Sequence, residues 1–114
     1  MTRIEAVLAR QGERFVRRIL TPVEQAEYAA SARQNRLLAT RFAAKEAVVK
    51  ALGTGIGNGV SWQDITVEHD ELGAPLVVLQ GGAAARARQL GGTRVLLSLA
   101  DEKDYIVAFA VLVP

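Results

Sequence analysis

The hydrophobic pattern of this 114-residue chain changes its period near the middle. Before the glycine-rich segment Gly53–Gly59, apolar residues recur at helical spacing, as Phe15 and Ile19 do. After that segment they alternate, with Ile65 and Val67 on one face of a predicted strand. Helices followed by strands are typical of an α+β fold, so we expect helices in the N-terminal half that pack on an antiparallel sheet.

Turn and cap signals divide the two halves into elements. Gly12 interrupts the first helical segment and favours two short helices over one. The run Thr21-Pro22-Val23-Glu24 has the Thr, Pro and Glu of a capping box, and it predicts a helix that lasts to about residue 32. The sequence then predicts a helix over 37–52, strands over 62–69 and 76–80, a helix over 83–90 and strands over 94–100 and 105–113. Because no linker or repeat interrupts this order, we expect a single domain over residues 1–114.

Composition limits the classes of protein that this chain can belong to. The chain contains no cysteine, which excludes disulfide scaffolds and thiolate metal sites and agrees with a cytoplasmic protein. Apolar runs stay far below the roughly 20 residues that cross a bilayer, and the N-terminus lacks the layout of a secretion signal. We therefore expect a cytoplasmic protein without a membrane partner.

The charges are distributed unevenly along the chain. Residues 1–50 carry ten Lys and Arg against five Asp and Glu, whereas residues 51–114 carry four against seven. The first half is therefore at +5 and the second at −3, within a net charge of +2. A basic half suggests an anionic partner on one face, and nucleic acid, a nucleotide cofactor and an acidic protein all remain open at this point.

The predicted helix over 37–52 carries a cluster of charged residues. Glu46 and Lys50 are four positions apart and are neighbours on its surface, where they can form an ion pair. Arg41 and Lys45 are expected to extend a positive edge along the same helix. The simplest interpretation of such a cluster is a solvated charged face, because exposed ion pairs contribute little.

The glycines that follow favour a more specific interpretation. Glycines at 53, 55, 57 and 59 exceed what a helix end requires, and they let backbone N–H groups approach an anion. The order helix, glycines, strand excludes the P-loop and the Rossmann loop, both of which run strand, glycines, helix. A carboxylate beside lysines suits Mg²⁺ held between protein and phosphate oxygens. The residues thus predict phosphoryl-type transfer or the binding of a nucleotide-like ligand.

Residues 41–57, RFAAKEAVVKALGTGIG, resemble the hallmark motif of the holo-[acyl-carrier-protein] synthases, the short bacterial branch of the 4′-phosphopantetheinyl transferases. Further matches cover residues 3–24, 59–77 and 96–112, so the resemblance runs nearly from end to end. It implies the phosphopantetheinyl transferase fold and a homotrimer with sites at subunit interfaces. It also implies Mg²⁺-dependent transfer of 4′-phosphopantetheine from coenzyme A to a serine of acyl carrier protein in fatty acid biosynthesis, with release of adenosine 3′,5′-bisphosphate.

The same resemblance assigns roles to individual residues. Glu46 corresponds to the magnesium-binding glutamate, and Lys50 to the lysine near the reacting phosphate, which makes these two the expected catalytic residues. The residues expected to bind the coenzyme are Arg41, Lys45, Gly53, Thr54 and Gly55, together with Gly73 and Pro75 from a neighbouring subunit.

Two departures from the family pattern stand out. Family members open with a strand that contains Gly-x-Gly-x-Asp-Ile-Val-Glu, just before the segment that matches residues 1–4. We therefore expect a domain that is N-terminally incomplete relative to the family, without a counterpart of its second metal-binding carboxylate, and Asp64 and Asp70 lie in other segments. The alternative function is a non-catalytic trimeric module that binds carrier protein or coenzyme A. The second departure is Ala100, where many members carry a histidine.

The arginines near the N-terminus form a candidate partner surface. If the first segment is one continuous helix, one side of it carries Arg3, Arg10, Arg14 and Arg18. By composition this is a solvated basic face, and the resemblance favours a docking surface for acyl carrier protein, which is acidic. His69, the only histidine, is expected to be an ordinary strand residue. A nucleic-acid partner is not expected, because aromatic platforms and a helix-turn-helix pattern are missing.

Overall fold

The structure, a computed structural model, describes residue 6 and residues 10–114. Among the described residues, helical residues at 10–11 are followed by helices α2 (Glu13–Ile19), α3 (Pro22–Ala30) and α4 (Gln34–Leu52). The second half contains a 3₁₀ helix η1 (Trp62–Asp64), strands β1 (Ile65–His69) and β2 (Pro75–Leu79), helix α5 (Gly81–Gln89), and strands β3 (Arg94–Asp101) and β4 (Ile106–Val113). The α+β prediction, with helices in the first half and antiparallel strands in the second, is confirmed.

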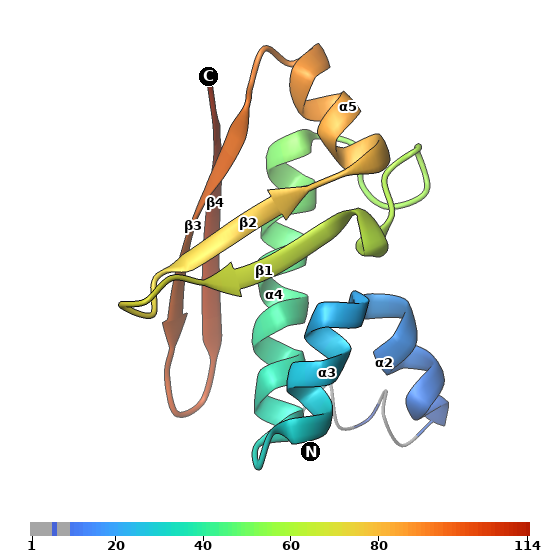
Figure 1. The fold of residues 1–114 in the computed structure, drawn as a ribbon, viewed down its shortest axis with the longest axis vertical. Coiled ribbons are helices and arrows are strands. Elements are labelled where there is room, and N and C mark those ends of the chain that lie inside the picture. The colour runs from blue at the N-terminus through green and yellow to red at the C-terminus, as the bar shows by residue number, and fades with distance from the viewer. Residues whose placement is uncertain (1–5, 7–9) are drawn as a thin grey trace.

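The long helix α4 is the element around which the others are arranged (Figure 1). Helices α2 and α3 lie against its N-terminal half, and α5 lies near its C-terminal end. The strands pack along α4, and β4 has the most extensive contact with it. One helix therefore contacts both the helical layer and the strands.

The strands form two antiparallel pairs. In the first, β1 pairs with β2 in a register that runs from Ile65 opposite Leu79 to His69 opposite Pro75. In the second, β3 pairs with β4, from Arg94 opposite Val113 to Asp101 opposite Ile106. Strand β2 packs beside β3, but the ladder hydrogen bonds of the described residues stay within the two pairs. The predicted antiparallel sheet is therefore divided into two hairpins, β1–β2 and β3–β4, which pack side by side.

Several predicted boundaries differ from the observed ones. Helix α4 begins at Gln34, three residues before the predicted start. The strand predicted over 62–69 is wrong in its first three residues, which form η1. Ser61 accepts a hydrogen bond from the Gln63 N–H, while Asp64 accepts one from the Ser61 N–H. These reciprocal caps stabilise a helical turn where the alternation of side chains predicted a strand.

The N-terminal segment is divided at Gly12, as one of the two predictions had it. Arg10 and Gln11 are helical, and Gly12 has a φ of 55° that ends this segment before α2 begins. A continuous basic helix, on which the single arginine face depended, is therefore wrong. The capping box of α3 is confirmed, because the Glu24 carboxylate accepts the Thr21 N–H at 2.9 Å.

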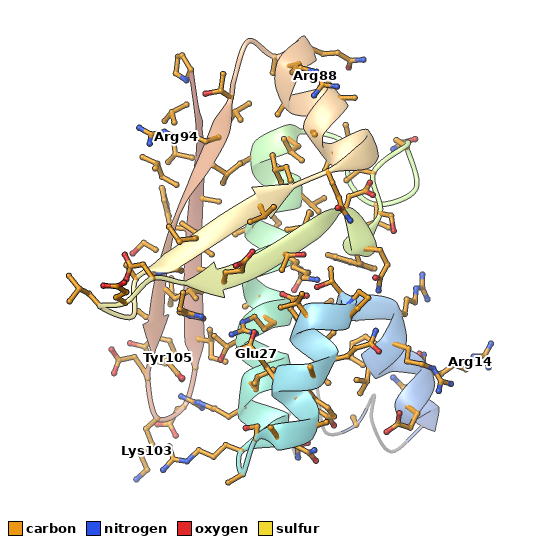
Figure 2. The ribbon with its side chains drawn as sticks, in the orientation of Figure 1. Arg14, Glu27, Arg88, Arg94, Lys103 and Tyr105 are labelled. Carbon is orange, nitrogen blue, oxygen red and sulfur yellow. The ribbon has the colours of Figure 1, made fainter. Side chains whose placement is uncertain are left out.

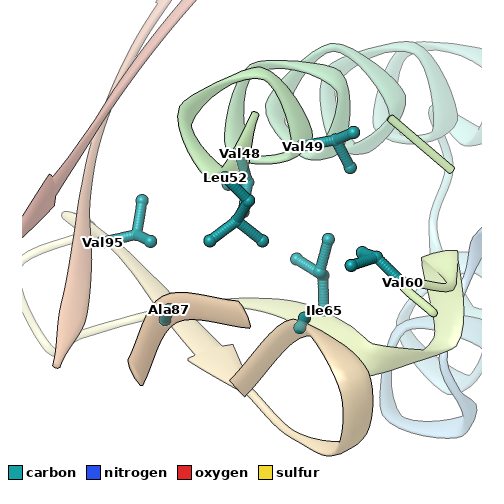
Figure 3. Packing of buried hydrophobic residues seen from close by; sticks show 8 residues of the cluster. Val48, Val49, Leu52, Val60, Ile65, Ala87 and Val95 are labelled. Atoms are coloured by element: carbon teal, nitrogen blue, oxygen red, sulfur yellow. The ribbon is translucent and has the colours of Figure 1, made fainter. Parts of the chain in front are cut away.

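Two apolar clusters make up the core, and α4 contributes to both. In the first, Val48 and Leu52 of α4 pack against Ile65, Ala87 and Val95 (Figure 3). The second cluster joins α2 to the N-terminal half of α4, and it consists of Phe15, Val16, Ile19, Leu20 and Leu38. The orientation of α4 is thus fixed from two sides.

The Phe42 ring lies between the rings of Phe15 and Trp62, with centroids 5.7 Å and 5.5 Å away. Trp62 is therefore a packing residue.

Candidate active site

A groove runs between α4 and β4 and contains two of the predicted site residues. It has a volume of about 470 Å³, and Glu46 and Lys50 line it together from α4. Its remaining lining residues are small or apolar: Ala43, Ala47, Ala51, Ile106, Ala108, Phe109 and Ala110. Alanines at three successive positions of one helix face leave the space into which the charged side chains extend. This groove is the candidate active site.

Glu46 and Lys50 line the same groove but do not form an ion pair with each other. Glu46 is half-buried and Lys50 is exposed. The predicted ion pair between them is absent among the described residues, in which the ion pairs involve other side chains. A carboxylate and an ammonium group are therefore both available to a ligand in the groove.

The glycine segment begins at Gly53, three residues after Lys50. Gly53 ends α4 with a φ of 74°, and its N–H donates to the Val49 and Lys50 carbonyls. The later glycines of the segment also have positive φ, and nothing lies within 4 Å of a Cβ placed on Gly55, Gly57 or Gly59. The segment is thus an open loop whose backbone a phosphate group can approach.

Thr54 adds a polar group to this loop. Its hydroxyl oxygen is buried and lacks a hydrogen-bond partner among the described residues, while its carbonyl accepts from Asn58 Nδ2 at 2.8 Å. A buried hydroxyl is rarely left unpaired, because the lost hydrogen bond has a free-energy cost. The loop therefore suits an oxygen-rich ligand.

Lys45 lies on the opposite side of α4 from the groove. It is completely buried, and its Nζ lies 2.5 Å from Glu24 Oε1. Burial lowers the pKa of the Lys45 ammonium group, and the charge of Glu24 opposes this shift. The prediction that Lys45 extends an open positive edge is wrong, because its position on α4 faces the core rather than the groove.

Arg41 is also turned inward. Only 4% of the residue is exposed, and its Nη2 lies 3.1 Å from Glu27 Oε2 and 3.3 Å from His69 Nδ1. Arg41 therefore does not line the groove, and the open positive edge is wrong for this residue as well. His69 contacts an arginine, and the described residues contain no group of three His, Cys, Asp or Glu side chains that could hold a metal.

The donor set fits Mg²⁺ in one specific way. Mg²⁺ is usually held by one or two protein carboxylates, with water and phosphate oxygens as its other ligands. Glu46, the carboxylate in the groove, fits this requirement. Asp64 and Asp70 do not serve as substitutes, because Asp64 caps η1 and Asp70 accepts the Leu72 and Ala74 N–H groups of the β1–β2 turn.

Gly73 and Pro75 lie apart from the groove within one chain. Gly73 belongs to the β1–β2 turn, which projects from the molecule, and Pro75 begins β2 (Figure 1). Leu72 at the tip of this turn is 96% exposed. Neither Gly73 nor Pro75 is among the residues that line the groove.

The described arginines of the partner surface are exposed. Arg14 and Arg18 lie one turn apart on α2, and Arg14 points into solvent (Figure 2). Arg10 is also exposed, on the other side of the Gly12 break, and Arg3 lies outside the described residues. Arg10, Arg14 and Arg18 are called the arginine surface below.

Sequence reasoning missed two residues that support the site. Arg86 of α5 donates from Nε to the Leu52 carbonyl at 2.9 Å, so it stabilises the end of α4 just before the glycine loop. A basic residue in α5 gave no signal of this contact. Glu24 was recognised only as a cap, although its carboxylate also pairs with Lys45.

Among the described residues, no helix has both the length and the apolar character to span a membrane.

Comparisons with known proteins give a consistent result. The model of the 4′-phosphopantetheinyl transferase superfamily matches residues 1–110. A holo-[acyl-carrier-protein] synthase of Vibrio cholerae serotype O1 is 53% identical over 110 residues, which are 96% of this chain and 87% of that protein.

Solved structures agree with the sequence comparisons. The crystal structure of holo-[acyl-carrier-protein] synthase from Neisseria meningitidis superimposes with a TM-score of 0.90 at 40% identity, covering 98% of this chain and 90% of that one. A holo-(acyl-carrier-protein) synthase from Bacillus anthracis in complex with CoA (3′,5′-ADP) gives a TM-score of 0.77 at 38% identity, with 96% and 85% covered.

Proposed function

The chain belongs to the 4′-phosphopantetheinyl transferase superfamily and is a transferase, and from this premise we propose that it transfers 4′-phosphopantetheine from coenzyme A to a serine of acyl carrier protein. One observation carries the proposal. Glu46 and Lys50 line the same groove, an open glycine loop begins three residues after Lys50, and the Thr54 hydroxyl has no hydrogen-bond partner among the described residues. A carboxylate, a cation and an open glycine loop at one place suit a substrate with a pyrophosphate.

Each residue of the groove and loop has a separate role in the proposed reaction. Glu46 would hold Mg²⁺, which supplies positive charge to the phosphate oxygens when bound. Lys50 stabilises the negative charge that develops on the leaving phosphate, and the loop residues Gly53, Thr54 and Gly55 bind the coenzyme through backbone and hydroxyl groups. The serine hydroxyl loses its proton to water as its oxygen forms a bond to the phosphorus on the pantetheine side. The bond from that phosphorus to the bridging oxygen breaks, and adenosine 3′,5′-bisphosphate leaves.

The arginine surface is the proposed docking site for acyl carrier protein. Arg10, Arg14 and Arg18 are exposed, and the ion pairs of the described residues do not include them. Charges that face an oppositely charged partner accelerate association and fix its orientation. With acyl carrier protein as its substrate, the proposed reaction belongs to fatty acid biosynthesis in the cytoplasm. Neither a nucleic acid nor a membrane is a proposed partner.

The outer face of the β3–β4 hairpin is the proposed contact between copies of the chain. Leu96, Val107, Phe109 and Val111 all lie on it, since Leu96 is opposite Val111 and Phe109 and Val107 follow at alternate positions of β4. Each of these side chains is about half exposed or more, with Phe109 at 68%. Apolar faces of this kind mark interaction surfaces. We propose that they meet in a homotrimer in which Gly73 and Pro75 of one chain reach the groove of a neighbour.

The experiment that tests this function follows the nucleotide product. The purified chain is incubated with coenzyme A and apo acyl carrier protein, with Mg²⁺ or with EDTA, and adenosine 3′,5′-bisphosphate is measured by chromatography. The proposal expects product with Mg²⁺ and none with EDTA or without the carrier protein. Coenzyme binding without product under every condition would contradict it and would leave the non-catalytic trimeric module as the better account.

A further inference from the structure

Helix α4 is tied to the two preceding helices by an ion pair that is completely buried. Lys45 and Glu24 are both 0% exposed, and Lys45 Nζ lies 2.5 Å from Glu24 Oε1. The same Nζ donates to the Ile19 carbonyl at 2.6 Å and to the Trp62 carbonyl at 3.3 Å. The lysine thus connects α4 with the end of α2, the start of α3 and η1.

The hydrogen-bonding capacity of the pair is fully used. An ammonium group has three N–H donors, and those of Lys45 find three acceptors. Glu24 Oε1 also accepts from the Thr21 N–H and hydroxyl, at 2.9 Å and 3.2 Å, and Oε2 accepts from the Val67 N–H of β1 at 3.0 Å. Removing either partner would leave an uncompensated charge in the core, so the two side chains keep each other in one geometry.

This geometry bears on the candidate active site because Lys45 and Glu46 are adjacent. Successive residues of an α-helix are turned by about 100° around its axis. With Lys45 held against Glu24, α4 cannot rotate or slide, and Glu46 stays in the groove on the β4 side. The bond to the Ile19 carbonyl fixes α2, which carries Arg14 and Arg18, in the same frame.

We propose that Glu24 and Lys45 are positioning residues for the transfer reaction. Their buried pair sets the distance between the arginine surface, where the carrier protein docks, and Glu46, where the phosphate is held. The acceptor serine of the docked carrier protein is then held close to the phosphorus that it attacks. The inference rests on the proposed function, because it assumes that carrier protein and coenzyme meet at these two places.

The test uses a double variant that removes both charges. Lys45→Met alone would leave Glu24 unpaired in the core and is expected to unfold the chain. Glu24→Gln combined with Lys45→Met keeps the volume and removes the charges, so it is expected to fold. Glu27→Gln is the matched control, because Glu27 also joins α3 to α4, through Arg41, but its side chain is 43% exposed.

Steady-state kinetics give the first readout. In the double variant, kcat with acyl carrier protein is expected to fall by at least about ten-fold, since displacement by roughly 1 Å has effects of this size. The KM for coenzyme A should stay within about two-fold, because neither Glu24 nor Lys45 lines the groove. Glu27→Gln should match the wild type. Glu24→Asp, which keeps the charge but shortens the side chain, should lose kcat in the same manner and covers the case in which the double variant does not fold.

Hydrogen exchange gives a second readout that does not depend on activity. The double variant is expected to exchange faster over residues 13–30, which span α2 and α3, with exchange over 94–113 unchanged. Three results for a folded double variant would each overturn the inference. They are a wild-type kcat, a loss of coenzyme A binding as large as the loss of kcat, and unchanged hydrogen exchange over residues 13–30. If the wild type transfers nothing, the proposed function fails by itself, and the exchange data then decide whether the pair holds α2 and α3 in place.

Discussion

At the scale of single residues, Lys45 and Glu46 show how one helix serves the core and the site together. They are neighbours in sequence, yet Lys45 is buried against Glu24 while Glu46 lines the open groove. Lys50 lies one turn after Glu46 and shares its face. The catalytic assignment therefore depends on which way each charged side chain of α4 points.

Replacing the groove carboxylate tests this assignment. Glu46→Ala, or the isosteric Glu46→Gln, should lower transfer by about 10²–10³-fold, because it removes a group that stabilises charge at the reacting phosphate. The thermal unfolding midpoint should barely change, since Glu46 has no ion-pair partner among the described residues. Glu68→Gln, at an exposed position of β1, serves as the control. Undiminished transfer by the Glu46 variants would refute the metal-binding role.

The lowered pKa of Lys45 predicts a pH dependence of stability. Because burial lowers this pKa below 10.5, the folded chain releases the proton of Lys45 at a pH at which the unfolded chain still holds it. Between the lowered pKa and 10.5 the unfolded state binds more protons, so the free energy of unfolding rises with pH. The cost of burying the charge is fully present below that window.

The measurement compares the free energy of unfolding of the wild type with that of the Glu24→Gln, Lys45→Met double variant. From about pH 8 to about pH 10, where carboxyl groups do not titrate, the difference should move in favour of the wild type. A difference that stays flat over this range would show that the pKa of Lys45 is not lowered.

The shared position of Glu46 and Lys50 in one groove could be predicted from the sequence, because the two residues are four positions apart on one helix. The burial of Lys45 and Arg41 could not. Which side of α4 meets the core depends on Glu24 and Glu27, which come from another helix. A charged residue in a charged run gives no sign that its partner lies across a helix interface.

At the scale of elements, α2 presents its arginines away from the packed face that buries Phe15, Val16 and Ile19. Reversing two of them, Arg14→Glu with Arg18→Glu, should raise the KM for acyl carrier protein by about ten-fold or more and leave the KM for coenzyme A within about two-fold. Added salt should raise the KM of the wild type for acyl carrier protein and reduce the difference in this KM between the wild type and the double variant.

The matched control reverses two arginines at the other end of the molecule. Arg88 and Arg94 are exposed and lie far from Arg14 (Figure 2). Arg88→Glu with Arg94→Glu changes the net charge by the same amount, so equal effects from both pairs would mean that general charge, and not docking on α2, governs carrier use.

Some helix boundaries could be predicted from neighbouring residues alone. The capping box of α3 and the break at Gly12 could be predicted from a few residues. Residues 62–64 alternate as a strand would, but the bonds between Ser61, Gln63 and Asp64 make a 3₁₀ turn. The pairing of strands into two hairpins depends on packing between distant segments, which periodicity does not contain.

At the scale of the whole molecule, one chain leaves a large apolar face uncovered on β3 and β4. Leu96→Glu places a charge on this face without touching the groove. It should convert a trimer into monomers, which light scattering would detect. Transfer should fall with the loss of the trimer. Leu90→Glu is the control, because Leu90 is 46% exposed, close to the 50% of Leu96, but lies at the end of α5. A wild type that is monomeric when active would contradict the shared site.

The most direct test of the central claim is the intact mass of acyl carrier protein after incubation with this chain, coenzyme A and Mg²⁺. The account predicts that the carrier gains one phosphopantetheine, and that a carrier with its acceptor serine replaced by alanine gains nothing. The Glu46→Gln chain should leave the carrier unmodified over the same time. An unchanged carrier mass with the wild-type chain, under conditions in which coenzyme A is bound, would contradict the account.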